Sequence, residues 1–219
     1  MTFSSRGSLP RARGVRNLPA MPSTSERSSE RPRARGNAAE RILAAAAECV
    51  GQLGAAQVSL QTVADSAGVS KALIHYHFRD RDELLARLVD WVTVQLVQGE
   101  DLALAEADAT TALDALWGWL EGELVSGRLR ALGELAGERG GAVRDAVRRS
   151  REARRAQATL TIERLFAVLS LTPRLPAPLV GDVTVAFLDG LAGEVAVEPE
   201  GNHRLRFDVF WLSVLSLAE

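Results

Sequence analysis

From Asn37 to the end of the chain, hydrophobic positions recur with the period of a helix. The first such stretch has a capping box at its start, with Glu40 three residues after Asn37, and Gly54 at its end. Its apolar face comprises Ile42, Ala46, Cys49, Val50 and Leu53. No stretch alternates between apolar and polar residues for long enough to indicate a strand. The pattern therefore predicts an all-α fold.

Two short helices joined by a tight turn are expected between residues 59 and 78. Ser59 and Ser70 are each placed to cap a helix, and Gly68 can adopt the positive φ that ends the first one. The expected inward positions are Val63, Ala64 and Ala67 in the first helix and Ile74 and Phe78 in the second. The small residues at 64 and 67 let the helices cross closely. This is a helix-turn-helix pattern.

Longer helices are expected in the rest of the chain. Asp80 and Glu83 form a second capping box before an apolar stripe from Leu84 to Leu96, and about five further helices follow. The last two, about residues 179–197 and 203–218, are apolar almost all round. Such helices must be covered on several sides, so we expect them to form a homodimer interface. A buried hairpin within one chain is the alternative.

Charge is distributed unevenly along the 219 residues. The net charge is −2, but residues 1–36 carry eight arginines against two glutamates, a net +6, which leaves −8 for the remainder. A basic, Ser/Pro/Gly-rich segment of this kind predicts a disordered arm at residues 1–36, which either contacts a polyanion or is a solvated tail. Met21 is an alternative start. No apolar run reaches the roughly 20 residues of a membrane span, and no secretory signal precedes the helices, so a cytoplasmic protein is expected.

The stretch "AGVSKALIHYHF" concentrates the polar chemistry of the chain, with its one lysine and two of its three histidines. On a helix, His75 and His77 point about 200° apart, so they cannot chelate one metal ion. No nucleotide-binding or catalytic motif is present, so neither a cofactor nor an enzyme is predicted. Lys71 can instead donate to guanine or to phosphate in a major groove, and the imidazoles and Tyr76 can donate to phosphate oxygens. A polar helix face turned to water is the alternative.

These features together resemble one family. The segment "AAERILAAAAECVGQLGAAQVSLQTVADSAGVSKALIHYHFRDRDELL" resembles the amino-terminal DNA-binding domain of the TetR family of bacterial regulators. The resemblance implies DNA contacts from Gln61, Ser70, Lys71, Ala72, His75, Tyr76, His77 and Arg81. Among these, Gln61 would contact a base, and His77 and Arg81 would bind phosphate. Two positions depart from the family's usual residues: position 75 is commonly tyrosine, and position 72 is often glycine.

The resemblance also implies an organisation and a function. Residues 37–85 would form the DNA-binding domain, with the motif at 59–78, and residues 86–219 a helical domain that dimerises and binds a small-molecule effector. The expected protein is a repressor that leaves a palindromic operator when the effector binds. Trp117 and Trp119 are weak candidates for effector contacts, with ordinary core residues as the alternative reading. Because residues 37–85 hold four basic against six acidic residues, a helical adaptor or ligand-binding protein without DNA-binding activity is the alternative function.

Overall fold

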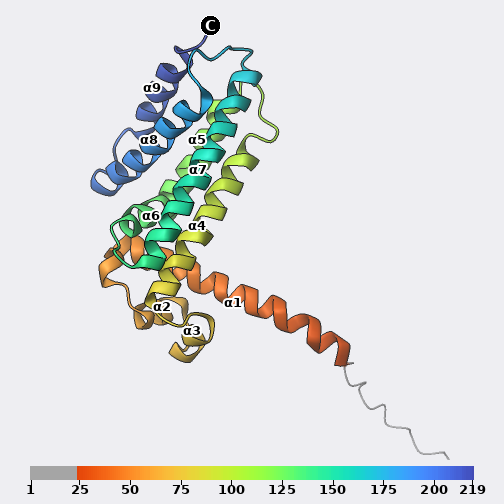
Figure 1. Ribbon diagram of the computed structural model, residues 1–219, viewed down its shortest axis with the longest axis vertical. Coiled ribbons are helices and arrows are strands. Elements are labelled where there is room, and N and C mark those ends of the chain that lie inside the picture. Colours follow the sequence, from red (N-terminus) through yellow and green to blue (C-terminus); the bar gives the residue numbers. More distant parts are fainter. Residues whose placement is uncertain (1–23) are drawn as a thin grey trace, which may run out of the picture. The chain divides into compact units, whose positions relative to one another are not determined.

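The computed structural model describes the backbone of residues 24–219 and the side chains from Ala38 onward (Figure 1). Its secondary structure is helical apart from one isolated bridge between Pro173 and Ala218, so the all-α prediction is confirmed. The elements are α1 (Thr24–Leu53), the 3-10 turn η1 (Ala55–Gln57), α2 (Leu60–Ala67), α3 (Lys71–His77), α4 (Arg81–Ala103), α5 (Ala112–Ser126), α6 (Arg128–Ala136), α7 (Gly141–Val168), α8 (Ala177–Val197) and α9 (His203–Leu215).

Helix α1 begins at Thr24, earlier than the start predicted at Asn37, so residues 24–36 of the predicted arm have helical backbone. The prediction for residues 1–23 lies outside the described residues. The segment contains Pro32 and Gly36, which both disfavour the interior of a helix, so its composition did not indicate the earlier start. A capping signature alone therefore placed the start too late.

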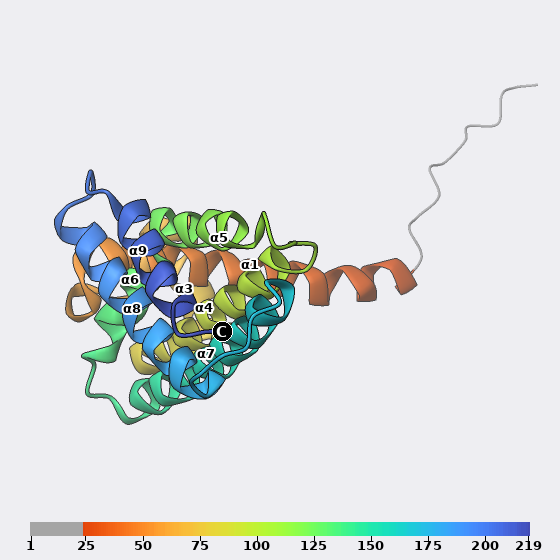
Figure 2. The ribbon, with the colours of Figure 1, turned by 90° about the horizontal axis from the view of Figure 1, so that it is seen from above.

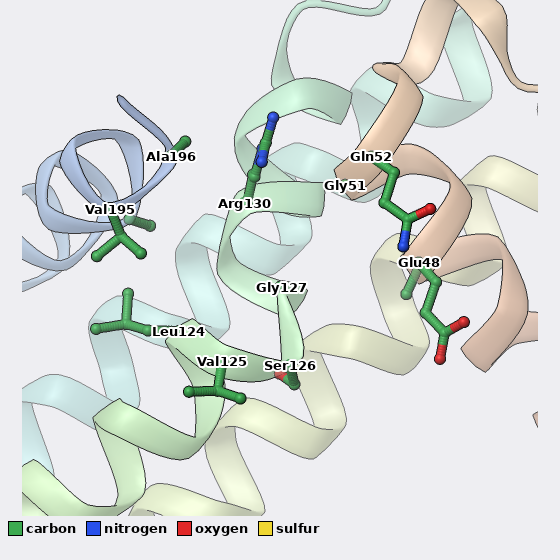
Figure 3. A pocket seen from close by; sticks show the side chains of 12 residues that line it. Glu48, Gly51, Gln52, Leu124, Val125, Ser126, Gly127, Arg130, Val195 and Ala196 are labelled. Carbon is green, nitrogen blue, oxygen red and sulfur yellow. The ribbon is translucent and has the colours of Figure 1, made fainter. Parts of the chain in front are cut away.

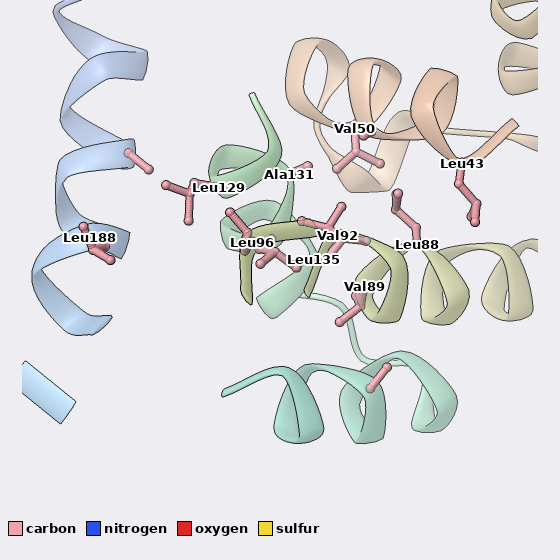
Figure 4. Packing of buried hydrophobic residues seen from close by; sticks show 14 of the residues in the cluster. Leu43, Val50, Leu88, Val89, Val92, Leu96, Leu129, Ala131, Leu135 and Leu188 are labelled. Atoms are coloured by element: carbon pink, nitrogen blue, oxygen red, sulfur yellow. The ribbon is translucent and has the colours of Figure 1, made fainter. Parts of the chain in front are cut away.

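A continuous apolar core joins α1 to α4, α6 and α8 (Figure 4). Ile42 and Val50 of α1 are fully buried, as is Phe78 at the end of α3. The stripe predicted on α4 is confirmed, because Leu84, Leu85, Leu88, Val92 and Leu96 are all buried. Each such side chain contributes about 1.5–3 kcal/mol on leaving water. The helix-turn-helix is therefore built into the same core as the helices that follow it.

Helix α4 continues across residue 85, where the boundary between the two functional parts was expected. It lies against α7 along much of its length, and α7 in turn lies against α8 (Figure 1). Helix α9 lies beside α8, as the view from above also shows (Figure 2). The chain end is held by reciprocal hydrogen bonds between the backbones of Thr172 and Glu219, both 3.0 Å long. No helix among the described residues is both long and apolar enough to span a membrane.

Candidate nucleic-acid interface

The turn between α2 and α3 has the hydrogen bonds that its sequence predicts. The Ser59 hydroxyl accepts from the Thr62 amide at 3.1 Å, and the Ser70 hydroxyl accepts from the Leu73 amide at 3.2 Å. Gly68 ends α2 with φ 63° and ψ 38°, a left-handed conformation that glycine adopts without strain. The next amide, that of Val69, donates to the carbonyl of Ala64 at 3.0 Å. Both short helices are therefore capped, and the helix-turn-helix prediction is confirmed.

Polar and apolar faces separate cleanly on α3. Ile74 and the C-cap residue Phe78 are fully buried. The exposed residues of the helix and its N-cap are Ser70, Lys71, Ala72, His75 and Tyr76. The Tyr76 ring is 59% exposed and meets the half-buried His77 edge-on, with ring centroids 5.1 Å apart. The structure thus brings six of the eight predicted DNA-contacting residues together on one short helix and its cap.

Lys71 begins α3 and differs from the other cations around it. Arg41 donates to the carbonyl of Ala67 at 3.3 Å, and Arg79 forms an ion pair with Glu83 at 2.8 Å. Residues 38–85 of the described chain contain four lysine or arginine side chains. Three of them have internal partners, whereas the Lys71 ammonium has no hydrogen bond or ion pair. Lys71 lies at the amino-terminal end of α3, the helix that would enter the major groove, and its ammonium is available to an external acceptor there.

Gln61 lies on α2, where its side chain is exposed. Its amide Nε2 donates to Oδ1 of Asp65, one helical turn on, at 2.7 Å. A carboxylate only accepts hydrogen bonds, so this contact fixes which end of the amide faces Asp65. Asp65 was not among the predicted site residues.

Arg81, which the resemblance assigns to phosphate binding, has several acceptors within the protein. Its Nε donates to the carbonyl of Val58 at 2.8 Å, and its Nη2 donates to that of Ala55 at 2.5 Å. The same guanidinium forms an ion pair with Glu138, with Nη2 3.0 Å from Oε1. These acceptors come from η1 and from the loop between α6 and α7, so local spacing in the motif did not indicate them.

The two capped helices cross at small residues, and the second begins with an exposed lysine, an arrangement typical of a helix-turn-helix DNA-binding segment. Residues 42–88 match the model of the bacterial regulatory proteins of the tetR family. This match covers the helix-turn-helix, so residues 42–88 have the DNA-binding segment of the TetR-family transcriptional regulators. A search of curated proteins found no match.

Solved structures agree over most of the chain. Regulatory protein TetR from Rhodobacter sphaeroides is 14% identical and has a TM-score of 0.69, over 82% of this chain and 98% of that one. A TetR transcription regulator from Haloarcula marismortui is 20% identical and has a TM-score of 0.67, over 84% of this chain and 100% of that one. SmeT, solved as a complex with triclosan, is 18% identical with a TM-score of 0.60, over 81% and 91%. At these identities the likeness shows the fold.

The two tryptophans proposed as effector contacts have different surroundings. Trp117 lines a cavity of about 540 Å³ beside the turn between α8 and α9, together with His203 and Arg204. Trp119 faces Gly99 of α4, where an added Cβ would lie 2.9 Å from its Nε1. That Nε1 is buried and has no hydrogen-bond partner among the described residues. Trp117 thus faces a cavity, whereas Trp119 packs against α4.

A second cavity, of about 430 Å³, lies between α1, the turn from α5 to α6, and α8 (Figure 3). Leu124 and Val195 form apolar walls, whereas Glu48, Gln52 and Arg130 bring polar groups to its rim. Because α1 belongs to the part matched by the family model, a molecule in this cavity would touch the DNA-binding segment directly. Its lining could not be read from the sequence, since it comes from three separated segments.

A buried carboxyl group was missed by the sequence reasoning. Glu100 is 7% exposed and accepts a hydrogen bond from the Thr161 hydroxyl at 2.6 Å. Burial raises the pKa of Glu100 to about 7, although the hydrogen bond from Thr161 and the charge of Arg154 act in the opposite direction. The signal was present, because Glu100 follows Leu84, Leu88, Val92 and Leu96 at four-residue intervals on the buried stripe of α4.

Proposed function

We propose that this chain is a TetR-family transcriptional regulator and not an enzyme: a homodimeric repressor that binds a palindromic operator through α2 and α3 and leaves it when a small molecule binds. The observation that carries this proposal is the amino-terminal start of α3, where Ser70 caps the helix and Lys71 is exposed without an internal partner. In helix-turn-helix proteins the amino-terminal residues of the second helix reach base edges in the major groove. The repressor acts in the cytoplasm in this proposal.

Each exposed side chain has a role that its chemistry fits. Gln61 and Lys71 would contact base edges, with the Lys71 ammonium donating to guanine or to phosphate. The hydroxyl of Ser70 and the side chains of His75, Tyr76 and His77 would contact phosphate oxygens and fix the register. Ala72 has no polar group, so it would allow close approach of the groove wall. Arg81 is not included because its acceptors are internal.

Dimerisation through α8 and α9 is supported by apolar side chains that remain exposed on both helices. On α8, Leu179 and Val183 are 52% and 51% exposed; on α9, Leu205, Val209 and Leu212 are 55%, 54% and 66% exposed. The spacing on each helix places these residues on one face. Exposed apolar faces of this kind mark interaction surfaces. A second copy would bring two recognition helices to one duplex, as a palindrome requires.

The effector would bind in the helical part of the chain that follows the helix-turn-helix. The cavity beside Trp117 and the cavity of Figure 3 are the two candidates. That SmeT was solved with triclosan supports a small organic molecule as effector. The ligand would weaken operator binding by favouring a different spacing of the recognition helices, which must lie about 34 Å apart to enter successive major grooves.

The test is selection of bound sequences from random duplex DNA with the full-length protein. We expect enrichment of a palindrome whose half-sites are one helical turn apart. Failure to enrich any palindrome would contradict the proposal and favour the alternative of an adaptor without DNA-binding activity. A salt titration on the full-length protein and on a protein lacking residues 1–36 then tests the arm. A shallower dependence of log K on log salt without these residues would indicate phosphate contacts by the arm.

A further inference from the structure

We propose that Arg81 and Glu138 act together as a latch that positions the helix-turn-helix, and that Arg81 supports operator binding through this contact and not by binding phosphate. The inference rests on the proposed DNA-binding function. It assigns a role to a residue, Glu138, that lies outside the DNA-binding segment and follows α6. It also gives Arg81, at the first position of α4, a role different from the one that its place in the motif implies.

The donors of Arg81 are almost fully used inside the protein. A guanidinium carries five N–H groups. Four hydrogen bonds involve them: to the carbonyl oxygens of Val58 and Ala55, at 2.8 and 2.5 Å, and to the two carboxylate oxygens of Glu138, at 3.3 and 3.0 Å. A bidentate contact with phosphate would require at least one of these bonds to break. Arg81 is thus committed to internal acceptors.

The acceptors define what the latch holds. Ala55 and Val58 flank η1, directly before the Ser59 cap of α2, and Arg81 itself directly follows the Asp80 cap of α4. One side chain therefore ties the segment before α2 to the segment after α3. Glu138 then fastens both to the loop between α6 and α7. The side chains of Arg81 and Glu138 are only 30% and 17% exposed, so the ion pair is weakly screened by water.

Close approach on both sides of the latch leaves little room for movement. A Cβ added at Gly140 would lie 2.7 Å from Oδ2 of Asp82, the residue after Arg81. A Cβ added at Gly54, just before η1, would lie 3.3 Å from Oε2 of Glu134 in α6. The latch therefore lies within a tight junction, and a shift at the end of α6 would displace η1 and the start of α4 together.

The test is operator binding measured over a range of salt concentrations, using a duplex that carries the palindrome recovered from random DNA. The variants are Arg81→Gln, Glu138→Gln and the double variant. If the latch positions the motif, both single variants weaken binding by about tenfold, because each leaves a partly buried charge unpaired. The double variant is no weaker than either single one, and the salt slope stays that of the wild type.

Three further proteins complete the design. Lys71→Gln is expected to lower the salt slope by about one if Lys71 contacts phosphate. Arg139→Gln removes an exposed charge next to Glu138 and is expected to leave the affinity unchanged, which controls for charge alone. Arg81→Lys is expected not to restore binding, because an ammonium has three donors and cannot reach the carbonyls of η1 and Glu138 in the same fork.

The opposite pattern would overturn the latch. A slope lowered by about one in Arg81→Gln, together with unchanged or tighter binding in Glu138→Gln, would make Arg81 a phosphate ligand. Additive losses, or no loss in either variant, would also contradict the proposal. Hydrogen exchange of the amides of residues 55–63, which is expected to accelerate in Glu138→Gln, needs no DNA. It therefore tests the latch separately from the proposed function. The proposed function, in contrast, would be overturned if the wild-type protein enriched no DNA sequence.

Discussion

Gln61 and Asp65 are joined by a 2.7 Å hydrogen bond in which the amide Nε2 donates to the carboxylate. Since Asp65 cannot donate, the Gln61 amide is turned so that its nitrogen faces Asp65 and its Oε1 remains an acceptor. An amide that offers an acceptor and one remaining N–H matches the N6 and N7 edge of adenine. In the proposed DNA complex, the pair would therefore favour adenine as the base that Gln61 contacts.

This orientation makes a prediction for operator specificity. We expect adenine at one position of each half-site, and Gln61→Ala should lower discrimination there by about 1–3 kcal/mol. Asp65→Asn, which can donate as well as accept, should let the amide turn over and broaden the tolerated bases. Selection from random DNA with each variant measures both effects. An unchanged base preference in Gln61→Ala would show that another residue reads this position.

The cap of α3 is expected to contribute to stability as well as to binding. Ser70→Ala removes the acceptor of the Leu73 amide and should lower the free energy of unfolding by about 1 kcal/mol. Urea denaturation of the two proteins measures the difference. Ser66→Ala is the matched control, because Ser66 is exposed on α2 and caps no helix. Equal losses in both variants would argue against a capping role.

The proposed dimer makes a prediction about a single leucine. Leu212→Asp introduces a charge on the exposed apolar face of α9 and should shift the protein from dimer to monomer and abolish operator binding. Light scattering coupled to size exclusion measures the mass. Leu102→Asp serves as control, since Leu102 is 72% exposed on α4, compared with 66% for Leu212. A Leu212→Asp protein that stays dimeric would remove α9 from the interface.

Glu100 gives the stability a predictable dependence on pH. Burial raises its pKa from 4.5 to about 7, so the folded protein keeps a proton that the unfolded chain releases above pH 4.5. The free energy of unfolding therefore falls as the pH rises from about 4.5 to 7, by up to about 3 kcal/mol from this group, and then levels off. Glu100→Gln should remove this fall.

The measurement is the difference between wild type and Glu100→Gln in urea denaturation across this pH range, because other groups titrate in both proteins. We expect the variant to gain relative to the wild type as the pH rises. Glu106→Gln, at an exposed site, should follow the wild type throughout. A constant difference between wild type and Glu100→Gln would mean that Glu100 has an ordinary pKa.

Local signals carried most of what could be predicted from the sequence. The caps at Ser59, Ser70 and Asp80 depend on residues three positions away, and each forms its expected hydrogen bond. The inward positions Val63 and Ile74 follow from the period of the helix. These features are set by neighbouring residues, so a single sequence is sufficient to find them.

What failed depends on residues far apart in the chain. Glu138 is 57 positions from Arg81, and no spacing rule connects them, so the sequence did not indicate the internal acceptors of Arg81. The start of α1 was placed too late because capping residues also occur inside helices. Glu100 lay on a visible apolar stripe, but whether a carboxyl group there is buried depends on Thr161 in α7.

The internal bonds of Arg41, Arg79 and Arg81 have a consequence for how the proposed repressor would find its operator. A helix-turn-helix with few available cations contributes little non-specific affinity, since attraction to phosphate supplies nearly all of that affinity. The eight arginines of residues 1–36 would then determine how tightly the protein holds bulk DNA. A protein without them would leave unproductive sites sooner, and its occupancy of the operator would vary less with the ionic conditions of the cell.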